Sequence, residues 1–459
     1  MSSKSIFTVL ALGLFASFIF ERINLLKTFY MNAPARLTKI NNIGVHEVKF
    51  SDRIRSCEDV LLVEKYHLAI LACDGGRERH NTVMGVFAGN VTENANLWAY
   101  DYETTGEESL KPIALAGFPN GNDFHSLGLA FDQHTSNLFV TNHAQAGPRI
   151  EMFNLDIDSL TARYIQTIEH PLLHGPNSIE IINDHEFYVS NDHYITKRQS
   201  VLISNLETYL GTPTGTVVHV SLKESKVEAK VVARVPFANG IEILNSSTVA
   251  VASSSRAAVY FFDTPDPTTL KYNSKILLPF LPDNLSGYGD KLMIAGHAHM
   301  PSLVKFTHSR RICNDPIEYE RASTKAREYC ETVEATSWAA EWSDSEGLKN
   351  LYVDTEYPSS STVVKGKGVG IITGLYAKGI MPISKKDRRN KEHKRADAAG
   401  TRAPVKANGL PVKPPKPTSI CQNCRKEIVN TNKLQLEVHA ETHDAKLWPK
   451  EKCWPNDFQ

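Results

Sequence analysis

Side chains that can bind a metal ion or move a proton recur at the start of similar β-rich segments along this 459-residue chain. Five segments open on an acid, an amide or a histidine, and they return roughly every 40 to 70 residues, which suits a repeat architecture. The openers are Glu58 with Asp59, His125, Asn177, Asn239, and Asp283 with Asn284. A sixth, weaker copy at 363–376 lacks the polar start. If each copy points the same strand end at one axis, these side chains converge on a single site.

The openers other than His125 offer only oxygen atoms as ligands. Hard divalent cations such as Ca²⁺ take sets of carboxylate and amide oxygens, whereas Zn²⁺ prefers histidine and cysteine. The sequence therefore predicts a calcium site built from Glu58, Asn177, Asn239, Asp283 and Asn284. The alternative is that Asn and Asp stand before strands because they form turns. The recurrence of polar openers at equivalent places in five repeats favours the metal.

Two histidines suggest base catalysis beside that metal. His125 and His143 flank one predicted hairpin, so both can face the same channel. A histidine near a metal-bound carbonyl can activate water, and a second histidine can relay the proton. The alternative is a structural pair at the channel mouth. His193, His297 and His299 either line the pocket or lie in exposed loops.

The elements that must position these side chains are short strands. From about 40 to 380, β-branched and aromatic runs are broken by Gly, Asn, Asp and Pro, which indicates an all-β fold. The repeats predict a six-bladed β-propeller, with outer strands at 96–103, 214–222 and 258–264. Residues 308–345 are charged and include a predicted helix at 316–333, so we expect an insertion between the fifth and sixth blades.

The ends of the chain differ from this middle. An apolar run at 6–20 favours an uncleaved signal or short membrane anchor within 1–30, with a buried strand or helix as the alternative. The propeller is expected at 31–382. A basic, Pro-rich linker at 383–420 is expected to be unpacked, and a small module follows at 421–459. Formal net charge is 0, so no global field is expected to draw the propeller to nucleic acid.

The cysteines and sequons bear on the cellular compartment. Four cysteines in the body permit two disulfides in an oxidising compartment, and Cys313 with Cys330 is a plausible local pair. The sequons at Asn90 and Asn245 are compatible with that compartment. The sequence thus favours a secretory, membrane-anchored or extracellular protein.

The terminal module carries a second metal motif. Cys421, Cys424, His439 and His443 have the spacing of a structural Cys2His2 zinc site, and a helix over the histidines would place both imidazoles on one face. With its basic leader, the region from about 384 to 459 resembles a small eukaryotic zinc-finger protein. One finger is a weak basis for nucleic-acid binding, though binding by the tail stays open.

The motifs of the body resemble one known family. SCEDV (56–60), FHSLGLAF (124–131), VTNHA (140–144), FANGI (237–241) and LPDNLSGYGDKLMIAGH (281–297) are similar to the paraoxonase, or serum arylesterase, family of calcium-dependent lactonases. The likeness spans about 5–382 and includes GPNSIEIINDHEFYVSNDHYIT (175–196). It implies a six-bladed propeller, a catalytic calcium on the five oxygen ligands and a dyad of His125 and His143.

The resemblance also implies features from which this chain departs. A second, structural calcium would use Asp59, the Leu127 carbonyl and a carboxylate at the position of Ser178. A hydroxyl replaces that carboxylate, so this second site is expected to be weak, empty or rebuilt. The family's disulfide between terminal strands has no cysteine near the sixth copy, so Cys57 pairs differently or stays free.

The expected function is calcium-dependent hydrolysis of lactones and aryl esters. A non-catalytic propeller scaffold is the alternative, and a nucleic-acid or protein-binding role for the zinc module is another. Zinc thiolates suit a reducing compartment and disulfides an oxidising one, so one hypothesis is that two adjacent genes were joined in this reading frame. A transcript with an in-frame stop near 384 would support it, and one continuous messenger would refute it.

Overall fold

A computed structural model describes residues 3–44, 46–89, 91, 93–223, 226–383, 417–431 and 433–458. The chain divides into two compact units, residues 1–391 and 392–459. The sequon at Asn90 and the linker between 384 and 416 lie outside the described residues.

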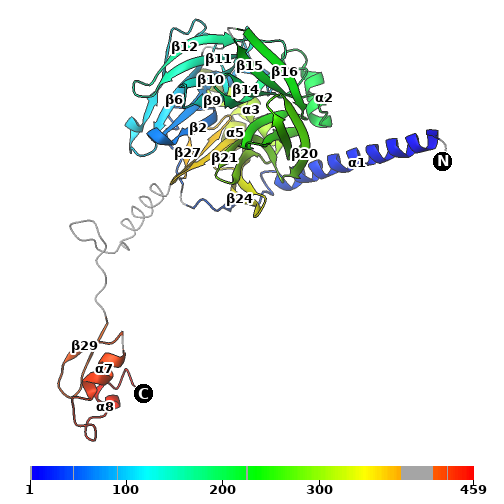
Figure 1. Ribbon diagram of the computed structural model, residues 1–459. Coiled ribbons are helices and arrows are strands. Elements are labelled where there is room, and N and C mark those ends of the chain that lie inside the picture. The colour runs from blue at the N-terminus through cyan, green and yellow to red at the C-terminus, as the bar shows by residue number, and fades with distance from the viewer. Residues whose placement is uncertain are drawn as a thin grey trace. The chain divides into compact units, whose positions relative to one another are not determined.

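The large unit is a ring of six antiparallel sheets around one axis (Figure 1). Each inner strand contacts the inner strand of the next sheet, and the last contacts the first, which closes the ring. The inner strands are β2 (Cys57–Val63), β9 (Ser126–Asp132), β13 (Pro176–Asn183), β17 (Ala238–Asn245), β21 (Leu281–Tyr288) and β25 (Ser360–Gly366). The prediction of a six-bladed all-β propeller is therefore confirmed.

Each blade grows outward from its inner strand by antiparallel pairing. The first blade adds β3 (Leu68–Asp74), β6 (Ala95–Asp101) and β7 (Leu110–Pro112). The second blade adds β10 (Asn137–Ala144), β11 (Gly147–Asp156), β12 (Thr161–Ile168) and β8 (Ala114–Ala116). Strand β8 is the exception to the antiparallel pairing, because it runs parallel to β12. The third adds β14 (Glu186–Asn191), β15 (Thr216–Lys223) and β16 (Lys226–Arg234); the fourth adds β18 (Thr248–Ser253), β19 (Ala258–Asp266) and β20 (Thr269–Leu277). The three predicted outer strands are β6, β15 and β19, each third in its blade.

The last two blades use segments from both ends of the propeller. The fifth holds β22 (Lys291–His297), β23 (Ser337–Ser343), β24 (Gly347–Asp354) and, at its edge, β1 (Ile40–Asn41); the sixth holds β26 (Val369–Gly374) and β27 (Met381–Pro382). Bridges from Lys49 to Ile380 and from Arg55 to Lys378 join the two ends of the ring. A ring closed by its own termini leaves no long free sheet edge between its first and last blades.

Alternating apolar residues bury between neighbouring blades. One cluster joins the fourth and fifth blades through Val259, Phe261, Ile294 and other fully buried side chains. β-branched and aromatic residues dominate because they pack well on a pleated surface. The disulfide between Cys57 and Cys73 links β2 to β3 within the first blade, which settles the pairing of Cys57.

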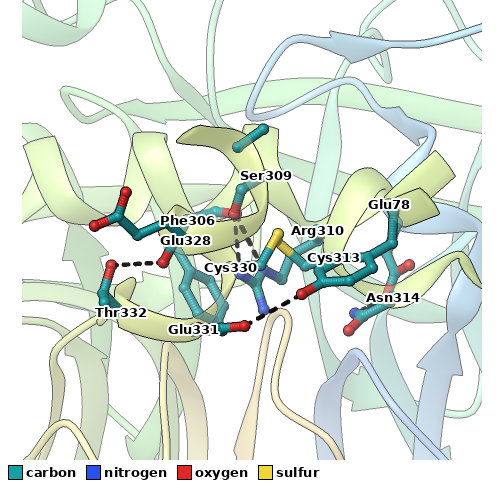
Figure 2. Close-up of a disulfide and its surroundings, with 12 residues drawn as sticks. Glu78, Phe306, Ser309, Arg310, Cys313, Asn314, Glu328, Cys330, Glu331 and Thr332 are labelled. Carbon is teal, nitrogen blue, oxygen red and sulfur yellow. Dashed lines mark hydrogen bonds between the residues drawn. A yellow bond between two sulfur atoms is a disulfide. The ribbon is translucent and has the colours of Figure 1, made fainter. Parts of the chain in front are cut away.

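The helical insertion lies inside the fifth blade, so its predicted place between the fifth and sixth blades is wrong. Helices α3 (Met300–Asn314), α4 (Pro316–Arg321) and α5 (Thr324–Thr332) connect β22 to β23. The disulfide between Cys313 and Cys330, confirmed here, ties α3 to α5 (Figure 2). A charged, helical segment suggests a break between two blades. The local sequence does not indicate to which blade the next strand belongs.

The N-terminal segment forms helix α1 (Ser3–Asn32), whose C-terminal part packs on the propeller (Figure 1). Asn32 Nδ2 donates to Pro279 O at 2.6 Å, and Arg22 Nη1 donates to Ser255 O at 3.0 Å. Leu25 and Phe29 pack against the cluster that contains Met300 and Leu303. Within the described residues, no helix combines the length and apolarity needed to cross a bilayer.

The small unit has its own strands, helices and core. It contains β28 (Thr418–Ile420), β29 (Glu427–Val429), α7 (Lys433–Ala440) and α8 (Lys450–Cys453). Cys421, Leu436, Ala440, Cys453 and Trp454 form a buried cluster. Trp454 Nε1 donates to Leu436 O at 2.9 Å, which fixes the C-terminal turn on α7.

Candidate functional site

The inner strands deliver the polar openers to the channel through a shared irregularity. The pairing of β2, β13, β17, β21 and β25 shifts register where each opener stands. A β-bulge adds a residue and disturbs the usual alternation of faces. Consecutive residues such as Asp283 and Asn284 are both buried at this point. A bulged inner strand can therefore place two consecutive polar residues at the hub, the part of the channel where the inner strands meet, as the fifth blade does with Asp283 and Asn284.

Hydrogen bonds join the openers of separate blades. Asn284 Nδ2 donates to Glu58 Oε1 at 2.8 Å, which links the fifth blade to the first. Asn239 Nδ2 donates to Asp283 Oδ1 at 2.5 Å, which links the fourth to the fifth. Asn177 is buried at the equivalent place on β13. Segments more than 200 residues apart in sequence thus meet at the hub, as the repeat pattern predicts.

Several hub oxygens have no donor. Among the described residues, Glu58 Oε2, Asn177 Oδ1 and Asn239 Oδ1 are buried without a hydrogen-bond partner. A buried acceptor left unsatisfied costs about 1–3 kcal/mol, so three of them together call for a ligand. Amide and carboxylate oxygens are the donor set that Ca²⁺ takes. The residues present therefore fit a calcium ion.

The electrostatics of the hub agree with that fit. Burial, together with the charges of Asp59 and Asp283, raises the pKa of Glu58 well above its ordinary value. Arg77 and the Asn284 side chain oppose this shift without cancelling it. Burial likewise raises the pKa of Asp59 to about 6, despite its hydrogen bonds. Neighbouring buried carboxylates are costly to ionise together, and a bound cation would offset that cost.

The sixth blade also contributes to the hub, a contribution that the sequence interpretation missed. Ser361 Oγ donates to Glu58 O at 2.6 Å, and Thr362 Oγ1 donates to Asp59 Oδ1 at 3.1 Å. Thr362 Oγ1 also accepts from Asn284 Nδ2 at 2.9 Å. The polar start of the sixth copy is thus a hydroxyl pair just before residue 363. The run of hydroxyl residues at 359–362 was the available signal.

The residues implied for a second calcium do not fit one. Asp59 Oδ1 accepts from Val60 N at 2.8 Å, and Asp59 Oδ2 accepts from Leu129 N at 2.8 Å. Ser178 Oγ accepts from Ile241 N at 3.3 Å and brings no negative charge. Leu127 lies on β9 and is buried. The second site thus lacks one of its two carboxylates, and hydrogen bonds from backbone N–H groups already hold the Asp59 carboxylate in place.

The two predicted catalytic histidines are both buried, but they have different neighbours. His125 Nδ1 lies 3.3 Å from Asp74 Oδ2, while among the described residues His125 Nε2 has no hydrogen-bond partner and lies 4.0 Å from Asp123 Oδ1. His143 Nε2 lies 2.6 Å from Pro176 O, and its Nδ1 hydrogen-bonds the Thr82 hydroxyl. In the described contacts no hydrogen bond joins the two rings, so the predicted relay stays a prediction.

Asp74 and His80 are site residues that the sequence interpretation did not identify. Asp74 ends β3 and is buried against His125. His80 Nε2 lies 3.0 Å from the His143 carbonyl, and its ring centroid is 5.1 Å from that of His125. Burial, aided by His125, lowers the pKa of His80 to about 4. Neither residue belongs to the repeated opener, so no pattern pointed to them.

Of the three further histidines, one reaches the hub. His297 Nε2 lies 3.1 Å from Asp283 Oδ2, and its Nδ1 has no partner among the described residues. His193 is buried and bonds Thr208 Oγ1 at 2.7 Å. His299 caps α3 by accepting from Ser302 N at 3.1 Å. His193 and His299 therefore have evident structural roles.

The fold and the hub together define a six-bladed propeller whose central channel holds a buried polar site. The family model for arylesterase matches residues 90–311, which include both predicted catalytic histidines and the predicted calcium ligands other than Glu58 and Asp59. The resemblance to the paraoxonase and arylesterase family is confirmed.

Curated relatives show the same likeness. Serum paraoxonase/lactonase 3 of Oryctolagus cuniculus is 32% identical over 164 residues, which are 35% of this chain and 45% of that protein. Serum paraoxonase/arylesterase 2 of Gallus gallus is 30% identical over 164 residues, with the same shares. The matches thus span slightly less than half the length of these relatives.

Solved structures are similar at low sequence identity. A luciferin-regenerating enzyme covers 74% of this chain and 94% of its own, with a TM-score of 0.43 and 11% identity. A gluconolactonase from Xanthomonas campestris covers 72% of this chain and 86% of its own, with a TM-score of 0.42 and 11% identity.

The small unit gathers its four predicted ligands. The ligand atoms of Cys421, Cys424, His439 and His443 all lie within 4.8 Å of one another. Cys421 Sγ is 3.5 Å from His443 Nε2, and Cys424 Sγ is 3.3 Å from His439 Nε2. Tetrahedral Zn²⁺ with ordinary bond lengths would separate sulfur and nitrogen by about 3.5 Å. These residues fit zinc, although α7 ends at Ala440 and His443 lies in the turn beyond it.

Proposed function

We propose that the propeller hydrolyses lactones and aryl esters at its hub in a calcium-dependent reaction. The observation that carries this proposal is a set of buried side-chain oxygens, on Glu58, Asn177 and Asn239, that accept no hydrogen bond from the described residues. They lie in a channel that also holds His125, which among the described residues has one ring nitrogen without a hydrogen bond and a carboxylate at the other nitrogen. The activities named for the relatives support the reaction class.

The metal would be held by Glu58, Asn177, Asn239, Asp283 and Asn284, the last after rotation of its amide. The oxygen and nitrogen of an amide are assigned from hydrogen bonds, so such a rotation needs no rebuilding. When bound, a divalent cation supplies polarisation of the substrate carbonyl and charge stabilisation for the developing oxyanion. Thr362 and Ser361 would hold Asp59 and the Glu58 backbone in place through the hydrogen bonds described above.

His125 is the proposed general base. With Asp74 accepting from Nδ1–H, the lone pair lies on Nε2, which makes no hydrogen bond among the described residues. That nitrogen can take a proton from water as the water attacks the ester carbon. Burial lowers the pKa of His143, so its ring is neutral at pH 7. His143 holds the Pro176 carbonyl and the Thr82 hydroxyl beside the site, and a relay through it remains part of the proposal.

A panel of lactones and aryl esters, assayed with Ca²⁺ and with EDTA, tests the function. Activity should vanish with EDTA and return with Ca²⁺. Asn239→Ala should abolish activity, and His125→Gln should lower kcat by about 10²–10⁴-fold. Asn273→Ala, on the exposed strand β20, is the matched control. Hydrolysis at an undiminished rate in EDTA would contradict the mechanism, and absence of hydrolysis of any substrate would favour a non-catalytic scaffold.

We further propose that the small unit is a structural zinc module. Its support is the convergence of two thiols and two imidazoles on one point. Elemental analysis of the full chain should find one zinc ion, and Cys424→Ser should remove it while the exposed neighbour change Gln422→Ser should not. Retention of zinc by Cys424→Ser would contradict the assignment. A nucleic-acid role would need salt-dependent binding that is lost with the zinc.

We also propose that the propeller meets a membrane through α1 and α2 (Val201–Leu210). Arg22 Nη1 donates to Tyr209 O at 3.3 Å, so the helices adjoin. Both expose large apolar side chains, among them Leu12, Phe15, Phe20, Leu26, Leu202 and Leu206. Exposed apolar patches of this kind mark interaction surfaces. Flotation of the purified chain with phospholipid vesicles tests this, and recovery of all protein in the unbound fraction would contradict it.

A further inference from the structure

A groove rich in positive charge lies beside the candidate active site. Its volume is about 570 Å³, and Arg79, His80, Lys197 and Arg198 line it together with the N-terminus of α2. Among the described residues, no carboxylate lines this groove. We call it the cationic groove.

Two of its three basic side chains, Lys197 and Arg198, have no carboxylate bound to them. Within the described residues, the Lys197 ammonium makes no ion pair or hydrogen bond; burial lowers the pKa of this ammonium, and the charge of Asp192 opposes that shift without cancelling it. Arg198 donates to the carbonyls of Ala144 at 2.8 Å and Gln145 at 2.7 Å, which leaves its charge unneutralised. Arg79 differs because it pairs with Asp315 at 2.8 Å. The groove therefore keeps a net positive charge.

The groove ends at the wall of the active site. His80 lines the groove, and its ring lies 5.1 Å from the ring of His125, measured between centroids. Arg198 lines both the groove and a small cavity beside His143. A substrate whose carbonyl is at the hub could therefore extend part of its length into the groove.

The helix that borders the groove adds to its potential. Ser200 caps α2 by accepting from Ile203 N at 3.3 Å. The N-terminus of a helix carries a partial positive charge, and this one adjoins Lys197 and Arg198. A pocket lined by one sign of charge concentrates ligands of the opposite sign.

We propose that the cationic groove binds a carboxylate carried by the substrate, so that the favoured substrates are esters or lactones with a negatively charged group away from the reacting carbonyl. This inference rests on the proposed hydrolytic function and narrows its substrate class. Lys197 supplies a point charge and Arg198 supplies N–H donors to the carboxylate. Uncharged substrates of the same reactivity lack this contact, and cationic ones are repelled.

Kinetics with a matched pair of substrates test the inference in the full, calcium-loaded chain. Phenyl pentanoate and the monophenyl ester of adipic acid differ only by a carboxylate in place of one terminal hydrogen, and the chain of the second is too long for ready attack by its own carboxylate. The charged ester should have the larger kcat/KM at low salt, and the advantage should shrink in 0.5 M NaCl because salt screens charge. Lys197→Gln and Arg198→Gln should each lower the ratio of the two kcat/KM values by about tenfold, mainly through KM of the charged ester.

Two controls separate failure of the inference from failure of the function. Lys271→Gln, on the exposed face of β20, removes a positive charge elsewhere and should leave the ratio unchanged. Hydrolysis of both esters with no charge preference, or a preference that survives both groove variants, overturns the inference while the hydrolytic function stands. If neither ester is hydrolysed, calorimetric titration with succinate decides. Binding that Lys197→Gln weakens supports the groove, and equal binding by both proteins, or none, overturns it.

Discussion

At the residue scale, the candidate site depends on pairs of buried side chains in which one stabilises the charge of the other. Asp74 and His125 form one pair, each about 2% exposed. The carboxylate holds the imidazole in the tautomer that leaves Nε2 free to accept a proton. A buried carboxylate beside a base also stabilises the imidazolium that forms when the base takes up a proton. Asp74 is therefore a positioning residue for His125.

Replacing Asp74 by Asn should expose that role. Asn can still accept from Nδ1–H but carries no charge, so we expect kcat to fall by about 10- to 100-fold with little change in KM. Asp74→Glu should recover part of the loss. Calcium affinity, measured by calorimetry, should stay the same in both variants. A variant that loses calcium in proportion to its activity would assign Asp74 to the metal site instead.

Glu242 offers a test of buried charge that is separate from catalysis. It lies in the channel near Glu180, and burial raises its pKa to about 7. Because the folded pKa exceeds the unfolded value, this carboxyl favours folding below about pH 4.5 and loses that contribution as pH rises through 7. Glu242→Gln keeps the acceptor for Gly287 N without the charge.

The expected result is a pH-dependent stabilisation. Glu242→Gln should raise the free energy of unfolding by about 1–3 kcal/mol at pH 8.5 and change it little at pH 4. Urea unfolding at the two pH values measures this in EDTA. The exposed Glu228→Gln on β16 is the matched control and should have little effect at either pH. An equal effect of Glu242→Gln at both pH values would show that burial does not raise the pKa of this carboxyl.

At the scale of elements, the inner strands and three outer strands were predictable, whereas several residues that complete the site were not. Openers with acids or amides repeat along the chain, and hydrophobic alternation marks the strands that follow. Ser361 and Thr362 were missed because hydroxyl residues resemble an ordinary strand end. Asp74 was missed because a single acid after a second strand has no periodic partner. Contacts that join blades across the ring depend on closure of the whole propeller, which no local pattern encodes.

Polar contacts and a disulfide hold the helical insertion of the fifth blade in place. Asn314 Nδ2 donates to Glu78 Oε1 at 2.6 Å, and Arg79 pairs with Asp315 (Figure 2 shows Glu78 and Asn314). Glu78 ends the short helix η2 (Gly75–Glu78), which directly follows Asp74. The disulfide between Cys313 and Cys330 closes a loop with a sequence separation of 17. The insertion therefore supports the segment that carries Asp74 and His80.

Opening that disulfide should loosen the insertion more than the propeller. In the double variant Cys313→Ser and Cys330→Ser, we expect faster amide exchange across 316–332, since a cross-link restricts the states open to the segment it closes. Exchange within the inner strands should change little. Mass spectrometry of exchanged peptides measures both. Unchanged exchange across 316–332 would mean that packing alone holds these helices.

At the scale of the whole molecule, two units carry two different metal chemistries. The propeller offers oxygens for a hard cation, and the small unit offers thiolates and imidazoles for zinc. Each unit has its own buried cluster, so each has its own source of stability. A ligand that binds only the folded state stabilises the unit that binds it.

Calorimetric scans of the full chain should therefore show two separable transitions. Added Ca²⁺ should raise the midpoint of the larger transition, and Zn²⁺ that of the smaller one. Cys424→Ser should abolish the response to Zn²⁺ and leave the response to Ca²⁺, while Asn239→Ala should do the reverse. The size of each transition assigns it, because unfolding enthalpy scales with the number of residues that unfold. A single transition shifted by both metals would mean that the two units unfold as one, and the two metal sites would then have to be energetically linked.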